Sequence, residues 1–299
     1  MSEFDADWLA LREVADERSR ARLPLDLLRQ SRREDPLRIL DLGSGTGANL
    51  RYLAPRIGGA QTWLLTDVSP RLLGATESRM QAWASSHGYG LTGGADAVEI
   101  AGPGFRCGYR LHVVDIAREL TRLPIPGQDL VTASALLDLV SDQWVEELVQ
   151  RCRAAGSDVL FALTYDGRVE CEPGVDDDAL VLASVNRHQR TDKGFGPAMG
   201  PLAWERTKNK LSREGYRVLR RSSDWRIEPG EAELQGALLS GWAEAAAQIA
   251  PQLQDRLETW YRNRNRLLMR GLSRLTVGHR DLFGHCGNES GPTRVRGFA

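Results

Sequence analysis

Short apolar runs alternate with amphipathic stretches along the first half of the chain. The runs have the length and composition of buried strands, and they lie at 38–42, 62–66, 109–114, 130–134 and 158–164. Between them, apolar positions at helical spacing predict helices over 49–57, 69–86 and 142–155. Strands that alternate with helices favour an α/β fold, in which helices cover both faces of a mainly parallel sheet.

The remaining segments extend this pattern at both ends. We expect helix over 5–31 with a break at Pro24, and a hairpin across Gly102-Pro103-Gly104 that leads into the third strand. The second half predicts helices at 176–190 and 202–214, a strand at 216–226, a helical stretch at 231–272 broken near Pro251, and a last strand at 275–283. The expected result is a seven-stranded sheet with N-terminal helices and a C-terminal helical insertion.

Composition limits the class of protein but does not indicate which reaction, if any, it catalyses. The 299 residues are 41% hydrophobic and 26% charged, which is typical of a globular chain. Lys and Arg total 39 and Asp and Glu total 40, so the net charge of −1 gives no strong global attraction to nucleic acid. No apolar run approaches the ~18 residues of a membrane span, and the N-terminus lacks the layout of a signal peptide. We therefore expect a cytoplasmic protein with no membrane partner.

Four cysteines are scattered along the chain, at positions 107, 152, 171 and 286. None forms a CxxC pair, so the spacing predicts neither a zinc site nor a redox motif. Scattered cysteines in a chain of this length favour reduced thiols over a disulfide framework.

The most informative segment follows the first predicted strand and contains three alternate glycines, Gly43, Gly45 and Gly47. Such a loop lets the backbone approach a ligand closely, and the next helix begins with free N–H groups. The loop also satisfies the dinucleotide fingerprint in its G-x-G-x-x-A form. However, Asp41 precedes it, where a pyrophosphate would meet negative charge. A ligand with a cationic amino acid moiety is favoured there instead.

Acidic residues also follow the next three strands. Asp67, Asp115 and Asp138 stand where strands two, three and four end. The carboxyl ends of parallel strands share one edge of a sheet, and such folds bind ligands at that edge. The alternative for each of these aspartates is a purely structural role, as a helix cap or a turn residue.

Between Leu37 and Thr164 the chain resembles the class I S-adenosylmethionine (SAM) dependent methyltransferases, which have a Rossmann-like fold. The resemblance implies SAM as cofactor and S-adenosylhomocysteine as product. It further implies that Asp41 and the glycine loop cradle the methionine part, that Asp67 accepts both ribose hydroxyls, and that Asp115 contacts the adenine amine. The implied cofactor residues are Asp41, Gly43, Ser44, Gly45, Thr46, Gly47, Asn49, Asp67, Val68, Ser69, Asp115, Ile116, Ser134 and Ala135.

The candidate catalytic residues are Asp138, His188 and Tyr165. Asp138 stands where many family members carry a histidine, and it is a general base, a substrate contact or a helix cap. Tyr165 follows the fifth strand, where an aromatic side chain would point toward the substrate in this family. The Asp166-Gly167 pair beside it is equally a turn signal. Candidate substrate contacts are Trp144, Asn186 and Arg190, with a core role as the alternative for Trp144.

The expected organisation is an N-terminal helical segment, 1–34, followed by a methyltransferase domain, 35–299. Within the domain we expect a substrate-recognition insertion at 170–215 and a helical insertion at 231–272. The expected activity is methyl transfer from SAM to an oxygen or nitrogen of a small molecule, by a monomer or homodimer that does not bind nucleic acid. The alternatives are an RNA or protein methyltransferase, a non-catalytic SAM-fold binding protein, and an NAD-binding oxidoreductase.

Overall fold

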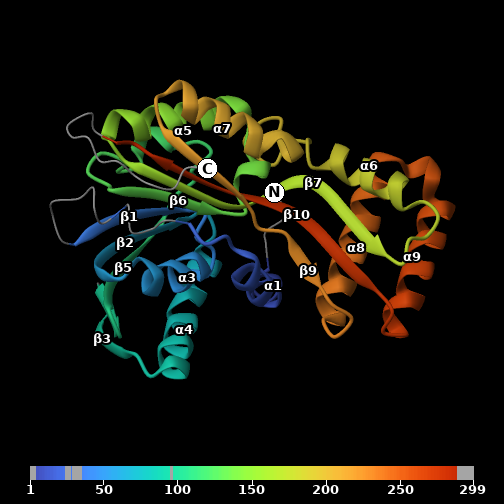
Figure 1. Cartoon of the computed structure of the whole chain (residues 1–299), viewed down its shortest axis with the longest axis horizontal. Helices are drawn as coiled ribbons and strands as arrows, with labels where there is room; N and C mark the ends of the chain where they lie inside the picture. The colour runs from blue at the N-terminus through green and yellow to red at the C-terminus, as the bar shows by residue number, and fades with distance from the viewer. Residues whose placement is uncertain (1–4, 24–27, 29–35, 95–96, 288–299) are drawn as a thin grey trace.

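A single mixed sheet runs through the protein and carries helices on both faces (Figure 1). The structure, a computed structural model, describes residues 5–23, 28, 36–94 and 97–287. The strands of the described residues are β1 Leu37–Leu42, β2 Gly59–Asp67, β3 Gly90–Gly94, β4 Ala97–Gly102, β5 Phe105–Val113, β6 Leu130–Ser134, β7 Asp158–Glu172, β8 Arg217–Ser222, β9 Trp225–Ile227 and β10 Arg274–His285. The α-helices are α1 Ala6–Ser19, α3 Ala48–Ile57, α4 Pro70–His87, α5 Asp142–Ala155, α6 Asp178–His188, α7 Ala203–Arg213, α8 Ala232–Ile249 and α9 Gln254–Met269.

The strand order is β3-β4-β5-β2-β1-β6-β7-β10-β8, with β9 paired to β10. Strands β5, β2, β1, β6 and β7 are parallel, whereas β10 is antiparallel to β7 and to β8. From β1 the chain builds the sheet toward β2 and β5 first, and then toward β6 and β7 on the other side. The carboxyl ends of β1 and β6 therefore flank the point where the strand order reverses, which is where ligands bind in such sheets.

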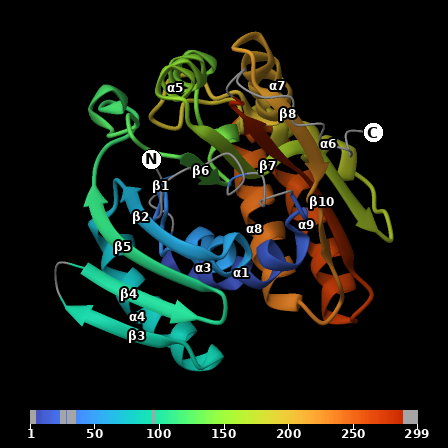
Figure 2. The ribbon, with the colours of Figure 1, turned by 60° about the vertical axis from the view of Figure 1, so that its left-hand side comes forward.

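The predicted α/β fold is confirmed, but the sheet is larger than expected. Within the described residues it has ten strands where seven were expected, because the hairpin strand β4 and its neighbour β3 extend the edge next to β5 (Figure 2). The strand expected at 216–226 is also divided into β8 and β9. Between them, the Ser223 hydroxyl donates to Asp281 and Asp224 accepts from Arg168, so these two residues leave the ladder.

Strand β7 continues beyond the predicted end at Thr164 and pairs with β10 along most of its length. Asp166-Gly167 is therefore not a turn that ends the strand. It lies in an irregular part of the ladder, where His279 opposes Tyr165 and Val277 opposes Val169. The extended pair β7–β10 reaches α6, α8 and α9 on one side of the molecule (Figure 1).

Alternation along the strands supplies two main cores. On β1, Leu40 belongs to the core under α5 and α7, whereas Ile39 belongs to the core under α3 and α4. A third apolar cluster joins β7, β9, β10 and α8, and a fourth joins α6, α8 and α9. The helical stretch predicted at 231–272 is confirmed as α8 and α9, with the break at Pro251.

The N-terminal helix α1 ends at Ser19, well before the expected boundary at residue 31. Residues 24–27 and 29–31 of that expectation lie outside the described residues. Helix α1 lies beside α3 in both ribbon views and contacts β9 and α8 (Figures 1 and 2). No helix in the described ranges is long and apolar enough to cross a membrane. All four cysteines are free thiols.

Candidate functional site

The three glycines of the loop between β1 and α3 adopt left-handed backbone conformations. Gly43, Gly45 and Gly47 have φ of 62°, 54° and 79°, a region that glycine enters without steric cost. A Cβ atom on Gly47 would lie 2.5 Å from Cε of Met80 and 3.1 Å from Cγ2 of Thr76, so the end of the Met80 side chain would have to shift. The Ser44 amide donates to the carbonyl of Thr66 at 2.8 Å, which fixes the loop to β2.

Beneath the loop, Asp41 and Asn49 form a buried polar chain with Arg20. Asn49 Nδ2 donates to Asp41 Oδ1 at 2.8 Å, and Arg20 Nη1 donates to Asn49 Oδ1 at 2.7 Å. Burial raises the pKa of Asp41 to about 7, although the bond from Asn49 opposes this shift. Asp41 Oδ2 and the Ser44 hydroxyl are buried and have no hydrogen-bond partner among the described residues.

Asp67 closes β2 and links it to the loop. Its Oδ2 accepts the Gly45 amide and its Oδ1 accepts the Ser69 amide, both at 2.9 Å. Each carboxylate oxygen keeps further acceptor capacity, because an ionised carboxylate has about four lone-pair sites. Ser69 caps α4 as predicted, since its side chain accepts from the Leu72 amide.

Two exposed valines flank this carboxylate. Val68 is 40% exposed, and Val113, which pairs with Asp67 across the β2–β5 ladder, is 53% exposed. The exposed apolar side chains offer a surface for a flat ring, and the carboxylate beside them offers acceptor oxygens for hydroxyl groups. Val68 was among the residues predicted from the sequence, whereas Val113, just before the Val114-Asp115 pair, was not.

Asp115 and Ile116 follow β5 at the same edge of the sheet. Asp115 accepts the Ala117 amide at 3.0 Å and forms a 3.6 Å ion pair with Arg118. Ile116 is buried, and its carbonyl accepts the indole N–H of Trp144 at 2.8 Å. Trp144 is buried too and packs edge-on against Phe195, so its position fits the alternative prediction for this residue, a role in the core.

Helix α1 also contacts the loop. A Cβ on Gly45 would lie 2.9 Å from Leu9 Cδ1, and Arg51 joins Glu13 of α1 to the carbonyl of Thr46. Leu9 and Arg51 therefore close the loop toward α1, whereas Val68 and Val113 beside Asp67 are exposed.

At the end of β6 the chain passes Ser134 and Ala135 and reaches Asp138. Ala135 has φ of 52°, and Leu163 on the adjacent β7 has φ of 54°. Non-glycine residues in this region are strained, and such residues cluster at functional sites. Asp138 is buried in a short 3₁₀ turn, and burial raises its pKa to about 6. The cap of α5 is Ser141, so Asp138 does not cap that helix.

Tyr165 and Asn186, which were expected from separate segments, are brought together. The Tyr165 hydroxyl donates to Asn186 Oδ1 at 2.9 Å, and Asn186 Nδ2 donates to the carbonyl of Gly167 at 3.0 Å. The backbone of Tyr165 also hydrogen-bonds to Asp138 and lowers its pKa against the larger effect of burial. Asp138, Tyr165 and Asn186 thus form one connected cluster.

The structure adds His279 and Arg12 to this cluster, which the sequence analysis did not assign to the site. The His279 ring packs edge-on against Tyr165 and lies 5.0 Å from the Trp225 ring. Burial and the nearby Arg12 lower its pKa to about 3, so the imidazole is neutral, and its Nδ1 has no partner within the described residues. Arg12, on α1, also lowers the pKa of Asp138. Trp8 and Leu11 of α1 pack against the apolar cluster that contains Tyr165.

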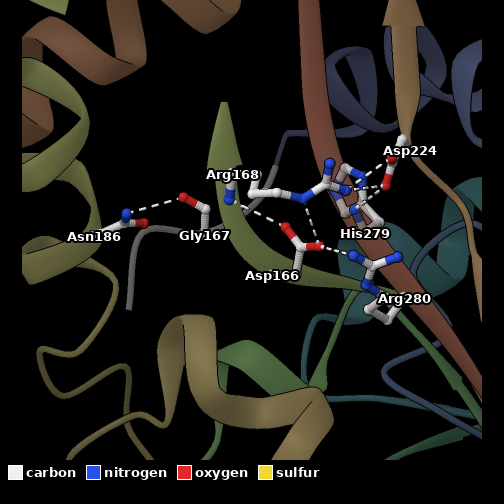
Figure 3. Close-up of polar contacts among 7 residues, drawn as sticks. All are labelled: Asp166, Gly167, Arg168, Asn186, Asp224, His279 and Arg280. Atoms are coloured by element: carbon white, nitrogen blue, oxygen red, sulfur yellow. Dashed lines mark hydrogen bonds and ion pairs between the residues drawn. The ribbon is translucent and has the colours of Figure 1, made fainter. Parts of the chain in front are cut away.

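A network of ion pairs fixes the strand that carries His279 (Figure 3). Asp166 accepts from Arg168 at 3.2 Å and from Arg280 at 3.0 Å. Arg168 reaches across to both carboxylate oxygens of Asp224 at 2.8 Å, and Asp224 accepts the His279 amide at 3.1 Å. The network ties β7, β10 and the β8–β9 connection together beside Tyr165.

His188 and Arg190 lie elsewhere. His188 contacts Gln248 of α8 at 3.0 Å and Lys193 at 3.5 Å, and burial and Lys193 lower its pKa. Arg190 is exposed beyond the end of α6. A search for groups of three or more potential metal ligands gives none within the described residues.

Comparisons with known proteins find solved structures that are similar to this chain at low sequence identity. No family model matches the chain, and no curated protein matches it. The fold is similar to a cyclopropane-fatty-acyl-phospholipid synthase-like protein from Lactobacillus casei, with 14% identity, 92% of each chain covered and a TM-score of 0.48.

Two further solved structures are similar at the same level. A cyclopropane synthase from Mycobacterium tuberculosis has 13% identity over 87% of this chain and 82% of that chain, with a TM-score of 0.42. An arsenic(III) S-adenosylmethionine methyltransferase from Chlamydomonas reinhardtii has 14% identity over 93% and 74%, with a TM-score of 0.41. Because these scores are low, a function has to be argued from the residues of the site itself.

Proposed function

We propose that this chain is a SAM-dependent methyltransferase that methylates an oxygen or nitrogen of a small molecule. The observation that carries the proposal is the three-glycine loop at the reversal point of the sheet, with Asp67 and Asp115 at the ends of the next two strands. A loop of this kind admits a ligand close to the backbone, and the two carboxylates supply acceptors along the open side.

The residues present fit the chemistry of SAM. The free lone pairs of Asp67 suit a vicinal diol, and the exposed faces of Val68 and Val113 suit an adenine ring. The unpartnered Ser44 hydroxyl and Asp41 Oδ2 offer buried polar groups at the loop for an amino acid moiety. When bound, SAM supplies an activated methyl group, and the protein's task is to bind and orient the reactants.

Asp138 is the proposed general base. Its pKa of about 6 leaves the carboxylate ionised near neutral pH, so Oδ of Asp138 can take the proton that an acceptor hydroxyl or ammonium loses. The Tyr165 hydroxyl, held by Asn186, and the neutral His279 ring then orient the acceptor. His188 faces α8 instead, so we do not assign it a role at the reacting atoms.

Enclosure of this cluster favours a small acceptor over RNA or protein. Asp138, Tyr165 and His279 are 7%, 8% and 6% exposed, and α1 packs against the apolar cluster that contains Tyr165. A polymer would need an open groove at the reacting atoms. The same polar cluster argues against a purely non-catalytic SAM-binding protein, because it places a carboxylate with a raised pKa inside a closed site.

Isothermal titration with SAM, S-adenosylhomocysteine and NAD separates the candidate cofactors. We expect SAM and S-adenosylhomocysteine to bind and NAD not to bind. Asp115→Ala should weaken SAM binding by about 1–3 kcal/mol, the range for losing one hydrogen-bond partner. Arg118→Ala is the matched control, because it removes the ion pair of Asp115 and leaves the carboxylate. Binding of NAD without binding of SAM would overturn the proposal.

Activity is tested by incubating the protein with methyl-labelled SAM and fractionated small metabolites. We expect label transfer to a metabolite, with Asp138→Asn reducing transfer while SAM affinity stays unchanged. Transfer to RNA or protein alone would favour the alternative acceptor classes. SAM binding without transfer to any of these acceptors would favour the non-catalytic alternative.

A further inference from the structure

A cavity of about 230 Å³ lies between the extension of β7 and the three helices α6, α8 and α9. Its walls come from all four elements, and the residues that matter here are Val169, Cys171, Val181, Val185, Trp242 and Trp260. The cavity lies where two apolar clusters meet. Val169 packs against the β7–β10 cluster, Val181 and Trp260 belong to the cluster of α6, α8 and α9, and Trp242 packs against both.

The charged residue at the cavity wall is neutralised within the protein. Asp178 accepts from Arg264 Nε at 2.9 Å, and a second guanidinium nitrogen completes a two-pronged pair. The Trp260 indole N–H also donates to Asp178 at 2.8 Å. Arg264 is fully buried, so the negative charge of the carboxylate and the positive charge of the guanidinium cancel within the wall. The cavity therefore offers no net charge to a ligand.

The thiol at the wall is uncharged as well. Burial raises the pKa of Cys171 to about 11, so the group is a protonated, weakly polar thiol at neutral pH. Aliphatic and indole surfaces make up most of the remaining wall, and apolar surface of this kind favours an apolar occupant over water.

The volume sets the size of that occupant. An apolar cavity of about 150 Å³ is large enough for benzene, whereas pockets for drug-sized ligands run from roughly 300 to 1,000 Å³. At about 230 Å³, this cavity matches one or two rings or a short aliphatic chain. Ala179 at its margin is exposed, which gives a ligand a way in.

We propose that this cavity binds an uncharged aromatic or short aliphatic group of a small molecule. If the proposed methyltransferase function holds, that molecule is the methyl acceptor and the cavity anchors its apolar part. The link is structural: Val185 lines the cavity, and its neighbour Asn186 holds the Tyr165 hydroxyl. Tyr165 and Val169 also lie in one apolar cluster on β7.

Indole is the probe, with binding followed by isothermal titration to the full chain. Indole should bind saturably, and tetramethylammonium, a compact cation, should bind at least tenfold more weakly. Leu182→Trp adds bulk at the cavity wall and should weaken indole binding at least tenfold. The matched control is Leu91→Trp on the remote β3, which should leave indole affinity unchanged.

Trp242→Ala provides a second variant that enlarges the cavity instead of filling it. It should shift the preference from indole toward a larger apolar probe such as anthracene, and thermal melting reports whether each variant is folded. No saturable binding of indole to the folded wild-type chain would overturn the proposal. So would equal affinity in folded Leu182→Trp, or binding of tetramethylammonium as tight as that of indole.

SAM titration of the same variants keeps the two proposals apart. We expect Leu182→Trp to bind SAM as the wild type does and to raise the KM of the acceptor identified by the metabolite assay at least fivefold. Indole binding without SAM binding would contradict the methyltransferase proposal and leave the ligand site standing. An unchanged acceptor KM in Leu182→Trp would overturn the anchoring role.

Discussion

The Tyr165 hydroxyl donates a 2.9 Å hydrogen bond to Oδ1 of Asn186, and this bond ties the end of the central sheet to helix α6. Tyr165 stands next to the buried Asp138, whereas Asn186 stands next to the cavity residue Val185. The two proposed parts of the acceptor site thus share one hydrogen bond.

Loss of this bond should be measurable as coupling between the two residues. Tyr165→Phe leaves Asn186 Oδ1 without its donor and should lower the free energy of unfolding by about 1–2 kcal/mol in urea. Asn186→Ala should cost at least as much, because it removes the bond to the Gly167 carbonyl as well. The double variant should lose about 1 kcal/mol less than the sum of the losses in the two single variants. Strict additivity would mean that the bond does not stabilise the fold.

Substitution of Gly47 should reveal how tightly the loop packs. Gly47→Ala puts a side chain at φ of 79° and against Met80 and Thr76, which must shift, so we expect a loss of about 2 kcal/mol in unfolding free energy. Gly88→Ala is the matched control, since Gly88 has φ of 67° but nothing within 4 Å of an added Cβ. It should cost about 1 kcal/mol from backbone strain alone. Equal losses in the two variants would contradict the packing argument.

The sequence predicted the part of the site that depends on local signals. Each apolar run between helices became a strand, and the alternate glycines before Ala48 marked the reversal point of the sheet. These signals are local because strand burial, helix capping and positive φ each depend on a few neighbouring residues.

The acceptor side of the site depends on contacts between distant segments. The sequence named Asp138, Tyr165 and Asn186 as candidates, but it did not predict that Tyr165 and Asn186 hydrogen-bond or that His279 joins them. The length of β7 depends on Arg280 and Asp224, which hold Asp166 and Arg168 in the irregular ladder. His279 becomes a buried ring with a lowered pKa because it packs against Tyr165 and Trp225, and Arg12, more than 250 residues earlier in the chain, lowers that pKa further. A single sequence carries no periodicity that reports such pairings.

Stability should depend on pH through Asp41. Burial raises its pKa from 3.8 to about 7, so the folded chain binds this proton more tightly than the unfolded chain does. The resulting stabilisation is fully present below pH 4 and is lost as the pH rises to about 7. Asp41→Asn removes the titration, so its unfolding free energy relative to wild type should rise by roughly 3–4 kcal/mol between pH 4 and pH 8. Urea unfolding at several pH values measures this difference, and a constant difference would contradict the assignment.

Removal of Arg264 should destabilise the helical layer that encloses the cavity. Arg264→Leu leaves the Asp178 carboxylate partly buried without its cation, and we expect a loss of about 3 kcal/mol in unfolding free energy. Adding Asp178→Asn to Arg264→Leu should recover part of this loss, because no stranded charge remains. Arg256→Ala is the control for an exposed pair, here with Asp177, and should change stability too little to measure. Chemical denaturation followed by Trp fluorescence compares the variants. If Arg264→Leu and Arg256→Ala unfold at the same urea concentration, Arg264 does not hold this layer together.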